Sequence, residues 1–367
     1  MLQGIRILDF TQYLPGPHAT HRLADMGAEV IKIEAPFGDP ARFSLDENEQ
    51  GPVFLAQNRK KKSVVLNLKD SSDRESALEL AREADILIEG FRPGVASRIG
   101  IGYDEIKQVN PEIIYCSLTG YGQTGPLSHL GGHDINYMAL SGMLAQMKDE
   151  NGKPHLPSNT LADFIGGISA SEAILAALVK KMQTGAGSYI DLAITKSLLP
   201  LMSNHVLIES LTGEKHGVEK LNSVFVCYTL YETADHRYIS LGALEQKFWH
   251  NFCDALGRED WKSKQFSKAS PGDPVYEEIS AAIKEKTLKE WSQFALKVDC
   301  CMAPVLESDD LAYADGLKEW NLISDNGSYR YMANQFTGLS ESTRDTEPPA
   351  LGAHTKECLS KFTHGGS

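Results

Sequence analysis

The sequence of 367 residues lacks the marks of several large protein classes. Its six cysteines are scattered without C-x-x-C spacing, so they indicate reduced thiols in a cytoplasmic protein, and the adjacent Cys300 and Cys301 are expected to fill the core. No apolar run reaches the ~18 residues of a membrane helix, so no membrane partner is expected. The formal net charge is also not positive: it is −13 at pH 7, which argues against nucleic acid as the main partner.

Motifs of several enzyme classes are also missing. Without G-x-S-x-G, an α/β-hydrolase is not supported, and without H-E-x-x-H or a Cys/His cluster no metal site is predicted. Residues 120–125 match the string G-x-G-x-x-G, which binds dinucleotides when it opens a helix. Here Pro126 and a loop-like stretch follow, so NAD binding is disfavoured.

The composition is that of an ordinary globular protein, with 42% hydrophobic and 23% charged residues. In the first half of the chain, short apolar segments alternate with helical ones, which predicts an α/β fold with a mostly parallel sheet and a ligand site beyond the carboxyl ends of its strands. The predicted strands are residues 6–10, 29–34, 63–68, 85–89, 113–118 and 187–193, and the predicted helices are residues 18–26, 73–83, 103–108, 134–144, 163–182 and 194–209.

A smaller α+β domain is predicted at residues 224–310. A linker at residues 196–223 precedes it and a return linker at residues 311–329 follows it. Within this domain we expect strands at residues 224–233, 238–242 and 303–305, and helices at residues 245–256, 276–285 and 287–298.

Two segments place proton-transfer groups at the openings of neighbouring predicted helices. Gly132–Tyr137 contains His133, and Leu161–Asp163 ends on a carboxylate; Asp134 and Asp163 are both expected as N-caps. A histidine and a carboxylate can exchange protons near neutral pH, and a helix N-terminus can hold an oxyanion. Together they could move a proton on a carbon next to a carbonyl. Taken singly, a histidine like His133 is more often a loop or capping residue than a catalyst, and an aspartate like Asp163 is more often a plain N-cap.

Basic residues occur at two predicted strand ends. Residues 59–62 read Arg-Lys-Lys-Lys just before the strand at 63–68, and Arg92 follows the strand at 85–89. Such a run is compatible with a solvated surface or with a clamp for ligand phosphates, and the sequence leaves both open.

Several segments, taken in order, resemble the family III CoA-transferases, and the resemblance covers nearly the whole chain. Within that family, Gly132–Tyr137 with Leu161–Asp163 is most similar to the α-methylacyl-CoA racemase branch. The segments that carry the family resemblance are residues 4–9, 15–17, 23–34, 58–63, 91–94, 120–122, 229–244, 304–305 and 352–355.

The resemblance implies a Rossmann-like large domain, residues 1–195, that is completed by the C-terminal segment 330–367. It also implies a homodimer of two interlocked rings. The active site would then lie between the large domain of one subunit and the small domain of the other.

In chemical terms, the resemblance implies an isomerase of lipid metabolism that racemises 2-methylacyl-CoA thioesters through an enolate. His133 and Asp163 would be the acid/base pair, and Glu245 would approach Asp163 from the small domain. This mechanism needs a raised pKa at Asp163, which burial and the Glu245 carboxylate would supply. No cofactor is expected beyond the CoA moiety of the substrate.

Two alternatives stay open. In the transferases of the family, the aspartate that matches Asp163 is a nucleophile that becomes acylated and then carries CoA; these enzymes also use a glycine-rich loop in the small domain, and no glycine run is present here. The second alternative is a protein that binds CoA without catalysing a reaction. In every case the resemblance assigns CoA contacts to Arg59, Lys62, Leu66, Asn67, Leu68, Lys69, Arg92, Gly132, Asp134 and Tyr137.

Overall fold

The chain forms two compact units in a computed structural model, which describes residues 1–43, 51–149, 151–218, 223–332 and 347–360. One unit comprises Met1–Ser203 with Asn321–Ser367, and the other comprises Asn204–Trp320. Each border lies within one of the two predicted linkers. Residues 219–222 of the first linker, and residues 333–346 and 361–367 of the predicted C-terminal segment, lie outside the described residues.

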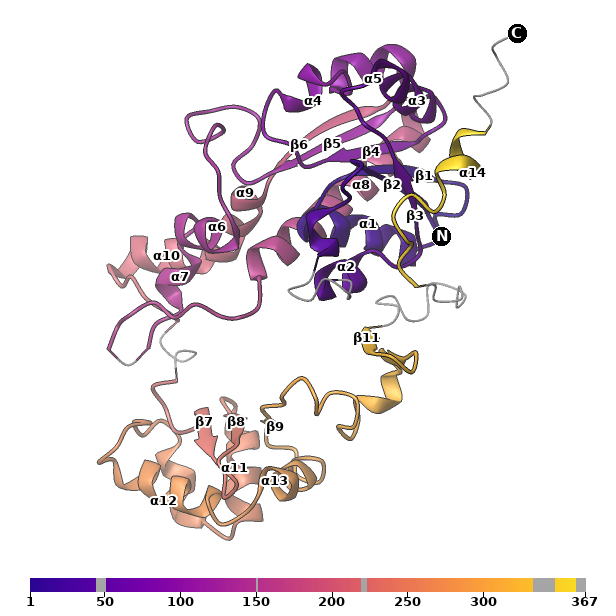
Figure 1. The fold of residues 1–367 in the computed structure, drawn as a ribbon. Helices are drawn as coiled ribbons and strands as arrows, with labels where there is room; N and C mark the ends of the chain where they lie inside the picture. Colours follow the sequence, from indigo (N-terminus) through magenta and orange to yellow (C-terminus); the bar gives the residue numbers. More distant parts are fainter. Residues whose placement is uncertain (44–50, 150, 219–222, 333–346, 361–367) are drawn as a thin grey trace. The chain divides into compact units, whose positions relative to one another are not determined.

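A six-stranded sheet organises the first unit (Figure 1). Its order is β3-β2-β1-β4-β5-β6 and every pairing is parallel, which confirms the predicted α/β class. Because the chain order reverses between β1 and β4, a crevice opens at the carboxyl ends of these two strands. The strands are β1 (Arg6–Phe10), β2 (Glu29–Glu34), β3 (Lys61–Val65), β4 (Ile86–Glu89), β5 (Ile114–Thr119) and β6 (Ser188–Ala193).

Helices cover both faces of this sheet. Helices α1 and α8 share one apolar cluster with the sheet, whereas α3 and α5 share another with its opposite face. The helices of this unit are α1 (Pro15–Asp25), α2 (Pro52–Gln57), α3 (Ser71–Arg82), α4 (Val95–Arg98), α5 (Tyr103–Val109), α6 (Asp134–Leu140), α7 (Met143–Gln146), α8 (Leu161–Thr184), α9 (Ile194–Leu198) and α14 (Thr355–Leu359), with the 3-10 turns η1 (Pro40–Arg42) and η2 (Leu199–Met202). A short hairpin, β10 (Ile323–Asp325) and β11 (Arg330–Met332), belongs to it as well.

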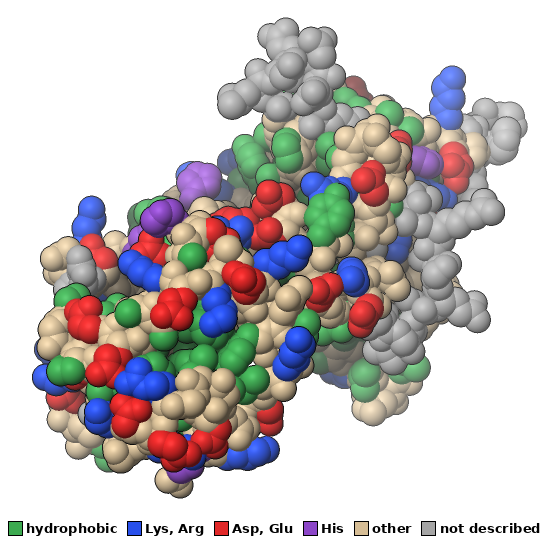
Figure 2. All heavy atoms as spheres, turned by 90° about the horizontal axis from the view of Figure 1, so that it is seen from below, with side chains coloured by type: hydrophobic (Ala, Val, Ile, Leu, Met, Phe, Trp, Pro, Cys, Tyr) green, Lys and Arg blue, Asp and Glu red, His purple; other side chains and the backbone are tan. Residues whose placement is uncertain are grey.

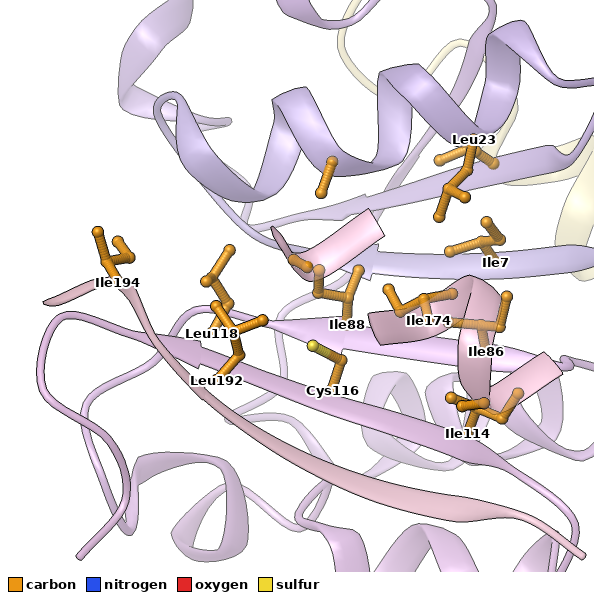
Figure 3. Packing of buried hydrophobic residues seen from close by; sticks show 14 of the residues in the cluster. Ile7, Leu23, Ile86, Ile88, Ile114, Cys116, Leu118, Ile174, Leu192 and Ile194 are labelled. Carbon is orange, nitrogen blue, oxygen red and sulfur yellow. The ribbon is translucent and has the colours of Figure 1, made fainter. Parts of the chain in front are cut away.

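The longest helix, α8, lies in the larger apolar cluster. Figure 3 shows Ile174 of α8 beside Ile86, Ile88 and Ile114 of the sheet. By length and composition alone α8 could cross a membrane. Its buried face packs on α1 and β5, however, so we interpret it as the core helix of this unit.

Two predicted helices are interrupted. Residues 194–209 form α9, then η2, then α10 (Ser203–Thr212), because Pro200 has no N–H to donate and its ring crowds the preceding turn. Residues 134–144 divide into α6 and α7 at Gly142, whose φ of 87° is left-handed.

The predicted N-caps are also wrong. The N-cap of α6 is His133 and that of α8 is Thr160. Asp134 is therefore the first residue of α6, and Asp163 is the third residue of α8. A carboxylate is favourable at either place, so the residue type alone does not distinguish them.

The second unit is a small α+β domain with an antiparallel sheet of order β7-β8-β9. Trp249, Trp261 and Trp291 are fully buried in its core. Of the predicted core cysteines, Cys300 is buried but Cys301 is exposed. The elements are β7 (Tyr228–Glu232), β8 (Tyr238–Gly242), α11 (Gln246–Ala255), η4 (Glu259–Lys264), α12 (Pro274–Ile283), α13 (Leu288–Ala295), β9 (Met302–Pro304) and η5 (Lys318–Trp320).

Charge on the molecular surface is mixed. On the described part of the face drawn in Figure 2, acidic and basic side chains are interspersed. That face therefore offers no continuous basic surface of the kind that binds nucleic acid.

Candidate active site

A cavity of about 660 Å³ opens in the first unit. Its lining includes the segments that follow three neighbouring strands: residues 11–16 after β1, residues 90–93 after β4, and residues 118–121 at the end of β5. The cavity thus lies at the carboxyl edge of the sheet, where the topology places ligand sites. His133 and Asp163 both line it.

His133 is held by the start of α6. Its backbone N–H donates to Oδ1 of Asn136 at 3.0 Å, and the preceding carbonyl of Gly132 accepts from Oη of Tyr137 at 2.6 Å. These two bonds fix the backbone on each side of the Cα, while the imidazole stays exposed. The residues from Gly132 to Tyr137 therefore fix the backbone from which the His133 side chain projects.

Two glycines leave room for the tyrosine rings beside this turn. A Cβ atom at Gly120 would lie 2.4 Å from the ring of Tyr137, and one at Gly132 would lie 2.7 Å from both Tyr137 and the hydroxyl of Tyr121. The two rings pack edge to face at 5.4 Å. In the G-x-G-x-x-G string the glycines thus serve packing and turns; no helix begins there, because α6 begins only at Asp134.

Asp163 lies in the first turn of α8, partly buried. Its backbone N–H donates to Oδ1 of Asp134 at 3.1 Å. Burial, and next the negative charge of Asp134, raise the pKa of Asp163 to about 6, although His133 acts in the opposite direction. The carboxyl group can therefore hold or release a proton near neutral pH, as acid/base chemistry requires.

The like charge beside Asp163 comes from Asp134. The sequence suggested Glu245 for this role and assigned Asp134 to CoA binding; the structure places the Asp134 carboxylate on the N-terminus of α8. Asp134 is 8% exposed and is absent from the cavity lining. Glu245 caps α11 in the second unit, where it is exposed, and its part in the site stays a prediction. In the sequence, only the position of Asp134 next to His133 hinted that its charge would act on the catalytic candidates.

Three of the residues that the sequence assigns to CoA line the cavity: Arg92, Gly132 and Tyr137. The others lie elsewhere in the first unit, and their assignment stays a prediction. Arg59 is 2% exposed and donates to the backbone carbonyl of Met332, and Lys62 lies between Glu29 and Glu357, at 2.8 Å from each. Leu66 is core, Leu68 packs against that core, and Asn67 and Lys69 are exposed.

The placement of Lys62 leads to a test. Because its ammonium group already bonds two carboxylates, we expect Lys62→Ala to leave the Kd for CoA within about twofold of wild type and to cost roughly 1 kcal/mol of stability from two partly exposed ion pairs. Calorimetric titration with CoA and urea unfolding would measure the two effects. A Kd weakened tenfold would instead support the assignment of Lys62 to the CoA site.

A buried charge network, which the sequence did not reveal, holds the cavity wall after β1. Thr11 donates its backbone N–H to Asp9 at 2.9 Å and accepts from Nζ of Lys32 at 2.8 Å. Asp39 bonds the same ammonium group at 2.8 Å and accepts the N–H of Tyr13, which has a left-handed φ of 63°. These contacts hold Tyr13, at the cavity lining, in a conformation that non-glycine residues rarely adopt.

Comparison with known proteins agrees with this architecture. The sequence model of CoA-transferase family III matches residues 2–355. Human alpha-methylacyl-CoA racemase is 30% identical over 373 residues, covering 98% of this chain and 93% of that protein. Human succinyl-CoA:glutarate CoA-transferase is 38% identical over 260 residues, covering 70% of this chain and 59% of that protein. This chain therefore spans less than two thirds of the latter relative.

Solved structures share the fold. Rv3272 from Mycobacterium tuberculosis superimposes with a TM-score of 0.82 at 29% identity, covering 98% of this chain and 99% of that one. A CAIB/BAIF family protein from Brucella suis gives a TM-score of 0.84 at 23% identity, covering 98% and 99%. With the family model spanning almost every residue, and with His133 and Asp163 on one cavity at the edge of the sheet, this chain belongs to CoA-transferase family III, the CaiB/BaiF proteins.

Proposed function

We propose that this protein racemises 2-methylacyl-CoA thioesters by removing and returning the α-proton. The observation that carries the proposal is that His133 and Asp163 line one cavity while the pKa of Asp163 lies near 6. An acid and a base that can exchange roles at neutral pH are what inversion at one carbon requires. Human alpha-methylacyl-CoA racemase, which matches over 98% of the chain, supports this choice.

The chemical step is balanced by two proton transfers. For one enantiomer, neutral His133 takes the α-proton, the C–H electron pair moves into an enolate, and protonated Asp163 delivers a proton to the opposite face. For the other enantiomer, ionised Asp163 is the base and protonated His133 the acid. Neither direction needs an electron acceptor or a metal ion.

The enolate oxygen needs a hydrogen-bond donor as it gains charge. The sequence suggests a helix N-terminus for this purpose. The N–H of Asp163 already donates to Asp134, so its use by an enolate would require that bond to open. We propose Arg92 as the contact for the CoA phosphates, since it lines the same cavity and carries a fixed positive charge.

A CoA-transferase is the second candidate function. Succinyl-CoA:glutarate CoA-transferase, at 38% identity, favours it, and Asp163 would then be the nucleophile that carries acyl and CoA groups in turn. Against it stands the small domain, where the sequence contains no glycine run.

One experiment separates the two functions. The protein would be incubated in deuterium oxide with (2R)-2-methylmyristoyl-CoA, with and without a free carboxylic acid, and the α-deuterium content and the configuration would be measured. A racemase incorporates deuterium at the α-carbon, inverts its configuration and does so without the added carboxylic acid. Absence of exchange, together with acyl transfer and a hydroxylamine-trappable ester at Asp163, would establish the transferase instead.

We also propose a homodimer in the cytoplasm, with Glu245 completing the partner's site. None of the six cysteines, which all lie in the described ranges, forms a disulfide, as is usual for proteins of a reducing compartment. The dimer is supported by the exposed apolar side chains of α10, which we call the α10 surface; no residue of this helix is buried. It consists of Val206, Leu207 and Leu211, each between 59% and 76% exposed.

Association through the α10 surface can be tested by introducing a charged side chain there. We expect the wild-type protein to sediment at twice the 40.3 kDa of one chain, and Leu207→Glu to raise the dissociation constant at least tenfold, since a buried carboxylate without a partner opposes association. Leu296→Glu, at a similarly exposed leucine outside this surface, is the control. A monomeric wild type would contradict the dimer.

A further inference from the structure

Arg92 differs from the other basic residues near the sheet. It is exposed and is the one Lys or Arg among the described residues that line the cavity. No hydrogen bond or ion pair joins its guanidinium to another residue of the described ranges, whereas Lys60, Lys61 and Lys62 each bond a carboxylate. Its charge is therefore available to a ligand, and its position depends on what surrounds it.

The backbone that carries Arg92 is fixed by a buried carboxylate. Glu89, the last residue of β4, is 2% exposed, and its Oε2 accepts the N–H of Phe91 at 2.7 Å. Ser117 of the neighbouring strand also bonds this carboxylate. On the other side, the carbonyl of Arg92 accepts the N–H of Val95 at 3.0 Å. The turn from β4 to α4 is thus held both before and after Arg92.

The guanidinium itself lies over a glycine. A Cβ atom at Gly131 would be 2.8 Å from Nη2 of Arg92 and 3.7 Å from its Cζ, and it would approach no other atom within 4 Å. The φ of Gly131 lies outside the left-handed region, so the backbone does not require glycine. Because Gly131 has no side chain, the space beside its Cα is open to the guanidinium of Arg92, the one group that a Cβ atom would meet there.

We propose that Glu89 and Gly131 are positioning residues for ligand binding: Glu89 fixes the turn that presents Arg92, and Gly131 leaves the space in which its guanidinium lies. The ligand class, a CoA thioester, rests on the proposed function. An arginine side chain has many rotamers, and a prearranged one loses less freedom when it bonds a phosphate. The two residues therefore act on the affinity for CoA and not on proton transfer.

Gly131→Ala tests the space directly, because its methyl group would displace only the end of a flexible side chain. We expect a Kd for CoA about tenfold weaker in titration calorimetry, the loss typical of one misplaced charged hydrogen bond. KM should rise by the same factor while kcat stays unchanged. In an Arg92→Ala background, Gly131→Ala should have no further effect beyond about twofold, since its target is gone.

Glu89 is tested by a pair of variants. Glu89→Gln keeps an oxygen that can accept the N–H of Phe91, so its Kd for CoA should stay within about threefold of wild type, whereas Glu89→Leu should weaken binding about tenfold. If Glu89→Leu does not fold, Gly131→Ala still decides the proposal.

Each outcome of these titrations has one meaning. An unchanged Kd in Gly131→Ala, or the same loss with and without Arg92, would overturn the inference while leaving the proposed function intact. Binding is measured without turnover, so a wild type that binds CoA but racemises nothing would contradict only the proposed function. A wild type that binds no CoA would overturn both.

Discussion

His133→Ala should slow the inversion of a 2-methylacyl-CoA by about 10²- to 10⁴-fold, the usual contribution of a positioned acid or base. Inversion needs a proton donor on each face of the α-carbon, and alanine removes one of them. Asp163 remains and can still take a proton from its own face and return a deuteron to the same place. Chiral separation and mass spectrometry of the product would therefore show exchange with retention of configuration for one enantiomer.

The same variant separates the two candidate functions. A transferase uses Asp163 as its nucleophile, so His133→Ala would leave acylation of Asp163 largely intact. His129→Ala is the matched control, because His129 is exposed in the same loop and does not line the cavity. Inversion that persists at the wild-type rate in His133→Ala would refute the racemase assignment.

The fold was predictable to the extent that it depends on local patterns. Buried parallel strands appear as short apolar runs, and the ends of all six were located to within three residues. Breaks inside helices were missed at Pro200 and Gly142. Proline and glycine were visible there, but apolar periodicity continued across them and outweighed the signal.

The site was predictable only in part, since long-range contacts decide it. His133 and Asp163 were identified through a family resemblance, and the structure places both on one cavity. The role of Asp134 depends on the N-terminus of α8 folding back against α6, which no local pattern encodes. The basic run at residues 59–62 is similar: its partners include Asp9, Asp25 and Glu357, far away in the sequence.

Asp134→Asn should shift the acidic limb of the pH profile to lower pH for both enantiomers. Asparagine keeps an oxygen that can accept the N–H of Asp163 but removes the negative charge that helps to raise the pKa of Asp163 to about 6. The pKa should then fall toward its ordinary value of 3.8. The active enzyme holds one proton shared by His133 and Asp163, so activity is present above the pKa of Asp163 and is lost as the pH falls through it and both groups become protonated. Each unit by which this pKa falls should move the acidic limb down by about one pH unit.

The measurement is the pH profile of kcat/KM for each enantiomer, which reports the groups of the free enzyme. Both enantiomers should show the displaced limb, because the equilibrium constant between them fixes the ratio of their kcat/KM values at every pH. Glu172→Gln removes an exposed carboxylate from the same helix and should leave both profiles unchanged. A limb near pH 6 that survives in Asp134→Asn would mean that burial alone sets the pKa of Asp163.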